Sequence, residues 1–486
     1  MVILTLESQH GKLGGNVSPA LEDEISHICS YWVQNAEKSN LYKKRRWDGY
    51  KKLYNRQKKT FPMGLLEYII ETLEKHNIKY KIEDNRSQSI AGGLDIHLKE
   101  NVKMRDYQLD AIETGIMKGR CVLQIATGGG KTVIASGIID KLKSNTLFIV
   151  HTKDLMYQTI DSFNDFLEHD DLVGQLGDGV IDVKPITVCT VQTLSKVLGL
   201  KFQKMVNDDS NFKEKKISDI KEARAAVSKM EVVIWDEVHR VACDMAYNVS
   251  EKLTNPLIRI GLSASAWRDD GADIMIEAAL GRKAYYLSAS DLIERGFLTQ
   301  PIIKMQYMKP QGYNSYGDDR KYDTIYREEI TDNKERNELI ANTFVDLVGM
   351  GIPTMILVQH IKHGKELKRL IEDRWDKITF LSGSDLSEVR NRTISQMKEG
   401  MMGLIATTIA DEGLDIKRLG GLILAGGGKS STRALQRVGR VLRPYEGKDN
   451  AIVIDFFDDI KYLNNHANKR MEIYKSEKNF IVLKTQ

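Results

Sequence analysis

Residues 123–135 combine the groups that phosphate chemistry needs, because a short apolar run leads into three glycines, a lysine and a threonine. Glycine backbone N–H groups can close around a polyphosphate, and a helix that follows adds the positive end of its dipole. Lys131 can reach the outer phosphates, and the Thr132 hydroxyl can ligate Mg²⁺. Ile125 replaces the usual first glycine of this pattern, so a glycine-rich turn that only ends a strand is the alternative. The residues assigned to the nucleotide are Thr127, Gly128, Gly129, Gly130, Lys131 and Thr132.

Two adjacent carboxylates, Asp236 and Glu237, follow the apolar run 232–235. The first can hold Mg²⁺ beside the phosphates together with Thr132, and the second can polarise an attacking water. An acidic turn without a catalytic role is the alternative. His239 is three residues after Asp236, so we expect it over the same crevice, where it could couple the nucleotide to a second domain.

Gln436, Arg440 and Arg443 are spaced at i, i+4 and i+7, which places them on one face of a helix. Guanidinium groups suit a γ-phosphate, because an arginine finger spreads the charge that develops in phosphoryl transfer. A basic helix face that only meets solvent is the alternative. Catalytic roles are therefore predicted for Lys131, Asp236, Glu237, Gln436, Arg440 and Arg443.

A glutamine stands 23 residues before Lys131, in the amphipathic run 105–112. A glutamine amide can pair with both N6 and N7 of adenine. Gln108, together with Arg105 at the start of the run, is therefore assigned to the nucleotide, although a surface glutamine without a ligand is the alternative.

After the glycine-rich loop, helical segments alternate with β-branched segments, which is typical of a doubly wound parallel sheet. Strands are predicted at 146–150, 186–190, 232–235 and 257–260. A polar cluster follows each strand, and ligands bind outside the carboxyl ends of such strands, so the clusters should gather over one crevice. They supply the predicted nucleic-acid contacts His151, Thr152, Lys153, Thr190 and Gln192, and the predicted coupling residues His239, Ser263 and Ser265.

A second α/β unit is predicted from about Pro301, with strands at 354–358, 378–381, 403–407, 421–424 and 451–454. It has no phosphate loop of its own. Thr407 and Thr408 follow its third strand and are predicted to contact a nucleic-acid backbone. The expected fold class is therefore α/β, with two doubly wound parallel-sheet domains and a small α+β domain before them.

Residues 1–95 are the expected small domain, with helices from Ser18 to about Glu37 and at 63–76, and a strand at 79–83. Between residues 41 and 60 there are nine Lys or Arg residues, one acid (Asp48) and four interleaved aromatic residues. Basic side chains release counterions from a phosphate backbone, and aromatic rings can stack on bases. A solvated face is the alternative. The residues assigned to nucleic acid here are Lys43, Lys44, Arg45, Arg46, Lys51 and Lys52.

The other predicted boundaries are a polar linker at 85–93, a first α/β domain at 96–300, a second at 301–460 and a basic tail at 461–486. A lysine-rich, helix-prone insert at about 196–230 interrupts the first of these domains. The tail is expected to pack on the second α/β domain.

The chain has 486 residues, which fits two to four domains. Its 71 basic and 67 acidic residues give a net charge of only +4, so a nucleic-acid surface requires local concentration of charge. The sequence has no run of 18 apolar residues and no signal-peptide pattern, so we expect a cytoplasmic location, in the host if a phage encodes the chain. The four cysteines lack a C-x-x-C pair, which argues against a zinc site or a disulfide framework.

The ordered set A-T-G-G-G-K-T, I-V-H-T-K-D-L, T-V-Q-T-L, D-E-V-H and S-A-S resembles the first RecA-like domain of a superfamily 2 helicase. Segments 407–415 and 436–443 resemble motifs V and VI of that superfamily, and the resemblance implies that Gly413 and Asp415 also meet the nucleotide. The W-D-G and F-P-M-G segments at 47–49 and 61–64 are similar to those of phage branch-migration helicases of the UvsW type.

The resemblance implies ATP and Mg²⁺ held between two RecA-like domains, and a monomeric motor acting on branched DNA such as forks and four-way junctions. The expected process is recombination, repair or replication. A duplex translocase that does not separate strands, an RNA helicase and a scaffold with an inactive nucleotide site are the alternatives. The insert at 196–230 belongs to this chain alone, so the preferred substrate geometry does not follow from the resemblance.

Overall fold

The computed structural model describes residues 1–86, 90, 92–200, 217–241, 243–264, 273–310, 320–407, 416–428 and 430–485. Contacts divide the chain into two compact units, which are described in turn. The first unit holds Met1–Ile125 and Gly130–Tyr286, and the second holds Ala126–Gly129 and Leu287–Gln486. None of the helices in these described segments is both long and apolar enough to cross a membrane.

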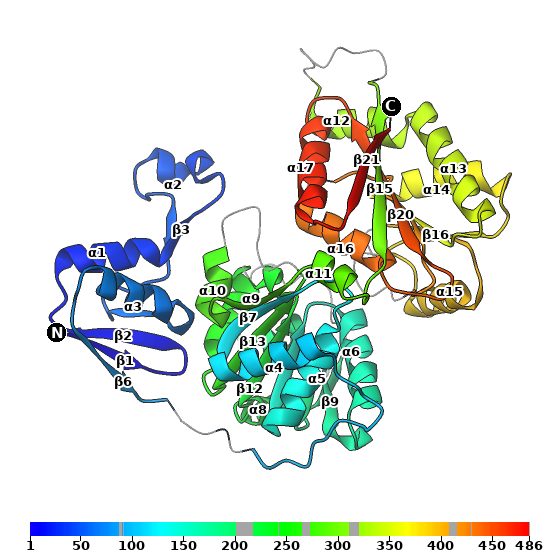
Figure 1. Ribbon diagram of the computed structural model, residues 1–486. Coiled ribbons are helices and arrows are strands. Elements are labelled where there is room, and N and C mark those ends of the chain that lie inside the picture. Colours follow the sequence, from blue (N-terminus) through cyan, green and yellow to red (C-terminus); the bar gives the residue numbers. More distant parts are fainter. Residues whose placement is uncertain are drawn as a thin grey trace. The chain divides into compact units, whose positions relative to one another are not determined.

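A small α+β domain forms the start of the first unit, where a four-stranded sheet in the order β5-β2-β1-β6 carries two helices (Figure 1). Its elements are β1 (Val2–Leu6), β2 (His10–Gly15), α1 (Pro19–Ile28), η2 (Met63–Leu65), α3 (Leu66–Lys75), β5 (Thr60–Pro62) and β6 (Tyr80–Asp84). The side chain of Ser18 caps α1, which has proline at its first position, as helix starts favour. Apolar faces of the sheet and both helices form one core.

The helix predicted to run from Ser18 to about Glu37 is wrong beyond Ile28. The chain leaves the helix there, and β3 (Ser30–Trp32) pairs antiparallel with β4 (Tyr50–Lys52). This pairing is non-local, so the helical pattern of the local sequence did not reveal it. Between the two strands lie η1 (Ala36–Lys38) and α2 (Asn40–Lys43).

The rest of the first unit is an eight-stranded sheet in the order β10-β9-β11-β8-β12-β13-β7-β14. The strands are β7 (Arg120–Ile125), β8 (Thr146–Val150), β9 (Val173–Gly177), β10 (Val180–Asp182), β11 (Ile186–Thr190), β12 (Val232–Asp236), β13 (Ile258–Ser263) and β14 (Lys283–Leu287). The central strands β9, β11, β8, β12, β13 and β7 run parallel. Their almost continuous apolar sequences are those of strands buried on both faces.

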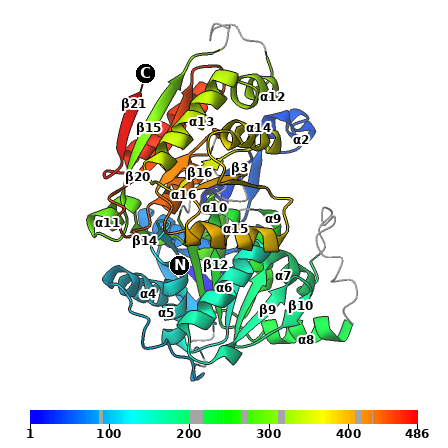
Figure 2. The same ribbon diagram turned by 90° about the vertical axis from the view of Figure 1, so that its right-hand side faces the viewer.

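Two rows of helices cover this sheet, and Figure 2 shows α4 and α5 on one side and α7 and α8 on the other. The first row is α4 (Asp106–Lys118), α5 (Lys131–Leu142) and α6 (Lys153–Phe166), and the second is α7 (Val191–Val197), α8 (Ile217–Val227), α9 (Asp244–Lys252) and α10 (Asp273–Leu280). Helix α8 lies in the predicted insert, which follows α7 and whose residues 201–216 are outside the described segments.

The small domain packs on α10 of the large sheet. A Cβ atom at Gly64 would lie 1.9 Å from the carbonyl oxygen of Glu277, so the backbones meet at a point that only glycine permits. The guanidinium of Arg282 lies 3.6 Å from the ring centroid of Tyr68 and pairs with Glu71, while the Tyr68 hydroxyl donates to Glu277. These contacts fix the small domain to the sheet that carries Lys131.

The second unit contains a seven-stranded parallel sheet in the order β17-β18-β16-β19-β20-β15-β21. Its strands are β15 (Gln300–Met308), β16 (Thr354–Leu357), β17 (Ile378–Leu381), β18 (Gly403–Ala406), β19 (Gly421–Ile423), β20 (Asn450–Asp458) and β21 (Ile481–Thr485). Its main helices are α13 (Lys334–Gly349), α14 (Ile361–Glu372), α15 (Ser387–Glu399), α16 (Ser431–Val441) and α17 (Leu463–Ser476). Helices α13 and α14 pack together over β16 to β19, and α16 and α17 pack together near β20 (Figure 1).

Candidate active site

The glycine-rich loop joins β7 to α5. The N–H of Gly129 donates to the Ala126 carbonyl over 3.0 Å, which turns the backbone, and Gly130 caps α5 in the left-handed region with a φ of +78°. A Cβ atom at Gly130 would lie 2.5 Å from Nε2 of Gln108, so a side chain there would displace the glutamine. Gly130 therefore adds no side chain at the start of α5, so the free N–H groups of the first turn of α5 stay accessible.

Gln108 is held in place by the helix that carries it. Its Oε1 accepts from the backbone N–H of Arg105 over 2.9 Å, which forms a capping box at the start of α4. Only 4% of Gln108 is exposed, and Nε2 is the end of the amide beside the glycine-rich loop. The Arg105 guanidinium donates to the Tyr107 hydroxyl. Gln108 lies next to the loop, and the roles of Gln108 and Arg105 in nucleotide binding stay predictions.

Three neighbouring parallel strands bring the next residues together. Strands β7, β13 and β12 are adjacent, so the side chains at their carboxyl ends share one edge of the sheet. Lys131 Nζ lies 3.3 Å from Glu237 Oε1, and the Ser263 hydroxyl donates to Glu237 Oε2 over 3.1 Å. Nδ1 of His239 lies 3.4 Å from the same Oε2 atom. Three predicted site residues, Lys131, His239 and Ser263, therefore converge on the Glu237 carboxylate.

The two acids of this site differ in their ionisation. Burial and the neighbouring charge of Glu237 raise the pKa of Asp236 to about 6. Burial also opposes ionisation of Glu237, but the positive charge of Lys131 and the contact with His239 outweigh it and hold the pKa of Glu237 below its ordinary value. Glu237 is thus the member of the pair that ionises first as the pH rises, and its backbone has the uncommon φ of +51°.

The donor set beside Lys131 fits a hard divalent cation. Asp236 ends β12 and Thr132 lies in the first turn of α5, so the available ligands are a carboxylate and a hydroxyl oxygen, as Mg²⁺ prefers. The raised pKa of Asp236 shows that a negative charge there lacks sufficient compensation from the protein alone. A cation would supply the missing compensation and keep both carboxylates ionised.

We expect the variant Asp236→Asn to be more stable than the wild type without nucleotide, although it should not turn over ATP. Because the pKa of Asp236 in the folded state is above the ordinary value of an aspartate, stability is lost as the pH rises from about 4 to about 6, and the full penalty is present above that. Asparagine removes a penalty of about 3 kcal/mol. Thermal melts at pH 7.5 and pH 4.5 would show a gain at the higher pH only.

Asp161→Asn, an exposed position on α6, is the matched control and should leave the melting temperature unchanged at both pH values. If Asp236→Asn melts below the wild type at pH 7.5, the carboxylate is well compensated by the protein and our account of the site electrostatics is wrong.

Strands β8 and β11 carry the predicted nucleic-acid contacts of the first unit, and the two strands are paired. Thr152 and Thr190 cap α6 and α7, since their hydroxyls accept from Leu155 N–H and Thr193 N–H. Two helix N-termini therefore start at neighbouring positions of the sheet edge, an arrangement that favours anions. The sequence did not indicate that these threonines act as helix caps.

The remaining polar residues at this edge are partly engaged. Lys153 Nζ pairs with Asp178 over 2.7 Å, and the Gln192 amide donates to the His151 carbonyl over 3.3 Å. Burial, with the nearby charges of Arg240 and His239, lowers the pKa of His151 to about 3. The His151 ring is therefore neutral at physiological pH and can contribute no charge to a phosphate contact.

The basic segment of the small domain separates into two groups. Lys43, Lys44, Arg45 and Arg46 are exposed around the end of α2, beside a hollow of about 770 Å³ that Trp47 also lines. Lys51 instead pairs with Asp244 at the start of α9, and Lys52 pairs with Asp48 over 2.7 Å. The first group is available for a phosphate backbone, whereas Lys51 helps to hold the small domain in place.

The interleaved aromatic residues pack on one another. Tyr42 and Tyr50 contact Trp32 edge-on, with ring centroids 5.6 and 5.4 Å apart. Trp47 donates from Nε1 to the Tyr50 carbonyl over 2.8 Å. These rings stabilise the β3–β4 pair, as the solvated-face alternative anticipates for aromatic residues, while Trp32 keeps 38% of its surface exposed.

In the second unit, Gln436 and Arg440 lie on α16, but the prediction that Arg443 shares their helix face is wrong. The helix ends at Val441, and Arg443 precedes Pro444. A residue before proline is disfavoured in the helical region, so the helix cannot extend through Arg443. Burial lowers the pKa of Arg443, and its carbonyl accepts from Lys448 over 2.8 Å.

Thr407 directly follows β18, where its N–H donates to the Leu381 carbonyl over 3.0 Å and 6% of the residue is exposed. Its place at the carboxyl end of a strand is the one predicted. Four other predicted site residues lie outside the described segments, namely Ser265, Thr408, Gly413 and Asp415.

Two parts of the chain match families of known proteins. Residues 101–267 match the family described as "Type III restriction enzyme, res subunit", and residues 335–445 match "Helicase conserved C-terminal domain". The two ranges contain Lys131, Asp236, Glu237 and Arg440, and together they span more than half of the chain. The chain is a superfamily 2 helicase. The predicted fold class, with two RecA-like domains and a small N-terminal domain, is confirmed for this helicase.

The helicase has relatives along most of its length. It is 26% identical over 509 residues to "ATP-dependent DNA helicase uvsW" of Enterobacteria phage T4, in an alignment that covers 95% of each chain. It is 24% identical to "DNA 3'-5' translocase XPB2" of Sulfurisphaera tokodaii, over 75% of the helicase and 83% of that relative.

Among solved structures, helicase Lhr of Mycobacterium smegmatis, bound to ssDNA and AMP-PNP, shares the fold. Its TM-score is 0.51 at 17% identity, over 76% of the helicase and 47% of that chain. As a member of its superfamily, the helicase hydrolyses ATP with a divalent metal ion and binds nucleic acid.

Proposed function

We propose that this helicase is a DNA motor that remodels branched DNA, such as forks and four-way junctions, in recombination, repair or replication. The observation that carries the proposal is the alignment over 95% of both chains with a phage T4 protein named as an ATP-dependent DNA helicase, because it includes the small N-terminal domain as well as the motor. Both RecA-like domains belong to one chain, so a monomer suffices.

Branch migration suits such a motor energetically. Opening one DNA base pair costs about 1.4 kcal/mol of stacking, and re-pairing elsewhere in a branch offsets that cost. The base pairs lost and gained during branch migration are nearly equal in free energy, so ATP hydrolysis only has to bias the direction of the exchange.

The nucleotide cycle that we propose starts from the Lys131–Glu237 pair. Lys131 exchanges Glu237 for the outer phosphate oxygens of ATP, while Thr127 to Gly130 surround the phosphates and Gln108 with Arg105 meets the adenine. Glu237 thereby loses the cation that holds its pKa down, so it becomes a better proton acceptor for the attacking water. Thr132 and Asp236 would hold Mg²⁺, which would supply neutralisation of charge on the phosphates.

A motor must couple ATP binding and hydrolysis to its contacts with DNA. His239 and Ser263 are the proposed coupling residues, because both contact Glu237. The backbone of one strand is proposed to lie across the capped starts of α6 and α7, near Thr152 and Thr190. In the second unit, Thr407 is the proposed contact. The exposed group from Lys43 to Arg46 is proposed to meet a duplex arm by phosphate contacts.

The proposal predicts that branched DNA stimulates ATP hydrolysis more than linear DNA does. We expect the rate of ATP turnover, measured at saturating nucleic acid, to be highest with a fork or a four-way junction. It should be lower with single-stranded or duplex DNA of equal length, and lowest with RNA. Steady-state ATPase assays with these five nucleic acids would decide. If linear duplex DNA stimulates ATP hydrolysis most strongly, a duplex translocase is favoured. If RNA does so, an RNA helicase is favoured.

A further inference from the structure

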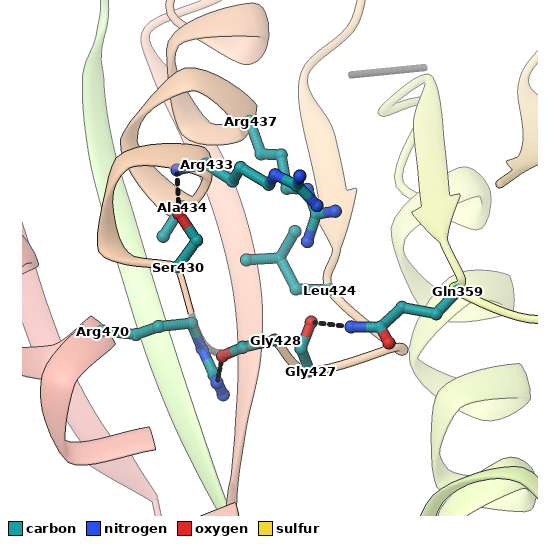
Figure 3. Close-up of a pocket in the computed structure, with 9 residues that line it drawn as sticks. All are labelled: Gln359, Leu424, Gly427, Gly428, Ser430, Arg433, Ala434, Arg437 and Arg470. Atoms are coloured by element: carbon teal, nitrogen blue, oxygen red, sulfur yellow. Dashed lines mark hydrogen bonds between the residues drawn. The ribbon is translucent and has the colours of Figure 1, made fainter. Parts of the chain in front are cut away.

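The second unit contains a pocket of about 250 Å³ at the carboxyl edge of its sheet, apart from the residues assigned to the nucleotide (Figure 3). It lies between the end of β16, the loop after β19 and the first turns of α16. The residues that line it are Gln359, Leu424, Gly427, Gly428, Ser430, Arg433, Ala434, Arg437 and Arg470. Three arginines and no carboxylate are among them.

Hydrogen-bond donors converge inside this pocket. A Cβ atom at Gly428 would lie 3.5 Å from Nε2 of Gln359 and 3.6 Å from Nη1 of Arg437, so the two nitrogens approach the same open side of the glycine. Figure 3 shows the guanidinium groups of Arg433 and Arg437 pointing into the same space over Leu424, opposite Gln359. Arg437 is only 8% exposed, so its position is fixed by packing.

The pocket carries excess positive charge. Both oxygens of Asp455 accept from Arg470, at 2.8 and 2.9 Å, which compensates that arginine. In the described part of the chain no carboxylate pairs with the exposed guanidinium of Arg433. The start of α16, capped by Ser430, adds the positive end of an eleven-residue helix. An anion is therefore the ligand that this charge distribution favours.

The volume limits the ligand further. Pockets for drug-sized molecules occupy about 300 to 1,000 Å³, so this pocket is too small for a whole nucleotide but large enough for a phosphoryl group. Planar guanidinium groups suit phosphate oxygens because they donate two parallel hydrogen bonds.

The pocket is formed at the first turns of α16, before the predicted arginine finger. Arg433 and Arg437 are four residues apart, and Gln436 and Arg440 each follow three residues later, which turns the second pair by about 60° around the helix axis. One helix therefore offers two sets of polar groups, and only the second was assigned to ATP.

We propose that this pocket binds a backbone phosphate of the nucleic-acid strand, through Arg433, Arg437 and Gln359. The inference rests on the proposed DNA motor function and adds a strand contact on the second unit. Arg433 is the exposed member of the set. It supplies positive charge to the pocket, whereas the charge of Arg470 is compensated by Asp455.

The test compares Arg433→Gln with Arg433→Lys in the full chain, by titrating fluorescent single-stranded DNA without nucleotide at 50 to 200 mM salt. A plot of the logarithm of the DNA association constant K against the logarithm of salt concentration has a negative slope. Losing one phosphate contact should make this slope less negative by about 0.7. The ratio of the DNA affinity of the wild type to that of Arg433→Gln should therefore fall about 2.6-fold between 50 and 200 mM salt. Arg433→Lys should keep the wild-type slope. Lys475→Gln, an exposed charge on α17, is the control for net charge and should also keep it.

Gln359→Glu is a second variant that does not depend on removing an arginine. It places a carboxylate in the pocket beside Arg437, so DNA binding should weaken at least as much as in Arg433→Gln. Circular dichroism would check that each variant is folded.

Each other outcome overturns the inference in a distinguishable way. An unchanged slope for Arg433→Gln, with wild-type ATPase still stimulated by DNA, removes the pocket contact and leaves the motor function intact. A raised KM for ATP without a change in DNA binding would assign the pocket to the nucleotide. If DNA neither binds nor stimulates the wild type, the proposed function itself fails.

Discussion

Lys131→Ala should lose ATP hydrolysis almost completely, with kcat lower by at least about 10²- to 10³-fold, the effect of removing one preorganised donor from a charged transition state. Lys131 is the only cation that the described residues place within 4 Å of a carboxylate oxygen of Glu237, other than His239. Its removal takes away the group that would hold the outer phosphates. It also removes a positive charge that lowers the pKa of Glu237 in the protein without nucleotide.

The measurement is DNA-stimulated phosphate release, together with DNA affinity in the absence of nucleotide. DNA affinity should stay close to that of the wild type, because no proposed strand contact depends on Lys131. Lys141→Ala is the matched control, since Lys141 is an exposed lysine in the last turn of the same helix. Its rate should be unchanged. A normal rate in Lys131→Ala would show that the ATP site is elsewhere.

The parts of the site that the sequence located well are those that follow strands of the parallel sheet. The β-branched runs at 146–150, 186–190 and 232–235 form β8, β11 and β12 within one residue of the predicted ends. A strand end in such a sheet fixes where the next residues lie, so Asp236 and Glu237 could be placed on the correct edge from sequence alone.

What the sequence did not reveal depends on contacts between distant segments. The β3–β4 pair interrupts the predicted first helix, and β21 joins the second sheet only by pairing with β15. Both pairings join segments that are far apart in the sequence, and the partner of an edge strand is decided by what remains unpaired after the rest has folded.

The pocket on α16 was missed for a different reason. Arg433 is four residues before Arg437, and this spacing was visible in the sequence. The third component, Gln359, comes from the end of β16 and reaches the pocket only through the tertiary structure. The basic pair on the helix was therefore visible in the sequence, but its partner Gln359 was not.

Arg440→Ala should lower kcat by about 10³- to 10⁵-fold while changing the KM for ATP little, if Arg440 acts as an arginine finger. The reason is that a finger stabilises charge that develops only in the transition state, so it contributes little to binding of the ground state. Arg440 is half-buried on α16, with a neighbour at Gly439 that adds no side chain. Arg443→Ala should have a smaller effect, because Arg443 lies past the helix end and is held by a less regular backbone.

Arg440→Lys discriminates between a finger and a simple point charge. Lysine keeps the charge but cannot donate two parallel hydrogen bonds, so a true finger would recover only part of the rate. Single-turnover hydrolysis with bound DNA would separate the chemical step from product release. Arg433→Gln is the contrasting variant on the same helix, since it should weaken DNA binding and leave kcat at saturating DNA unchanged. If Arg440→Ala retains kcat within tenfold of the wild type, the guanidinium does not touch the transferring phosphate, and the second RecA-like domain must contribute to the motor through the strand contacts alone.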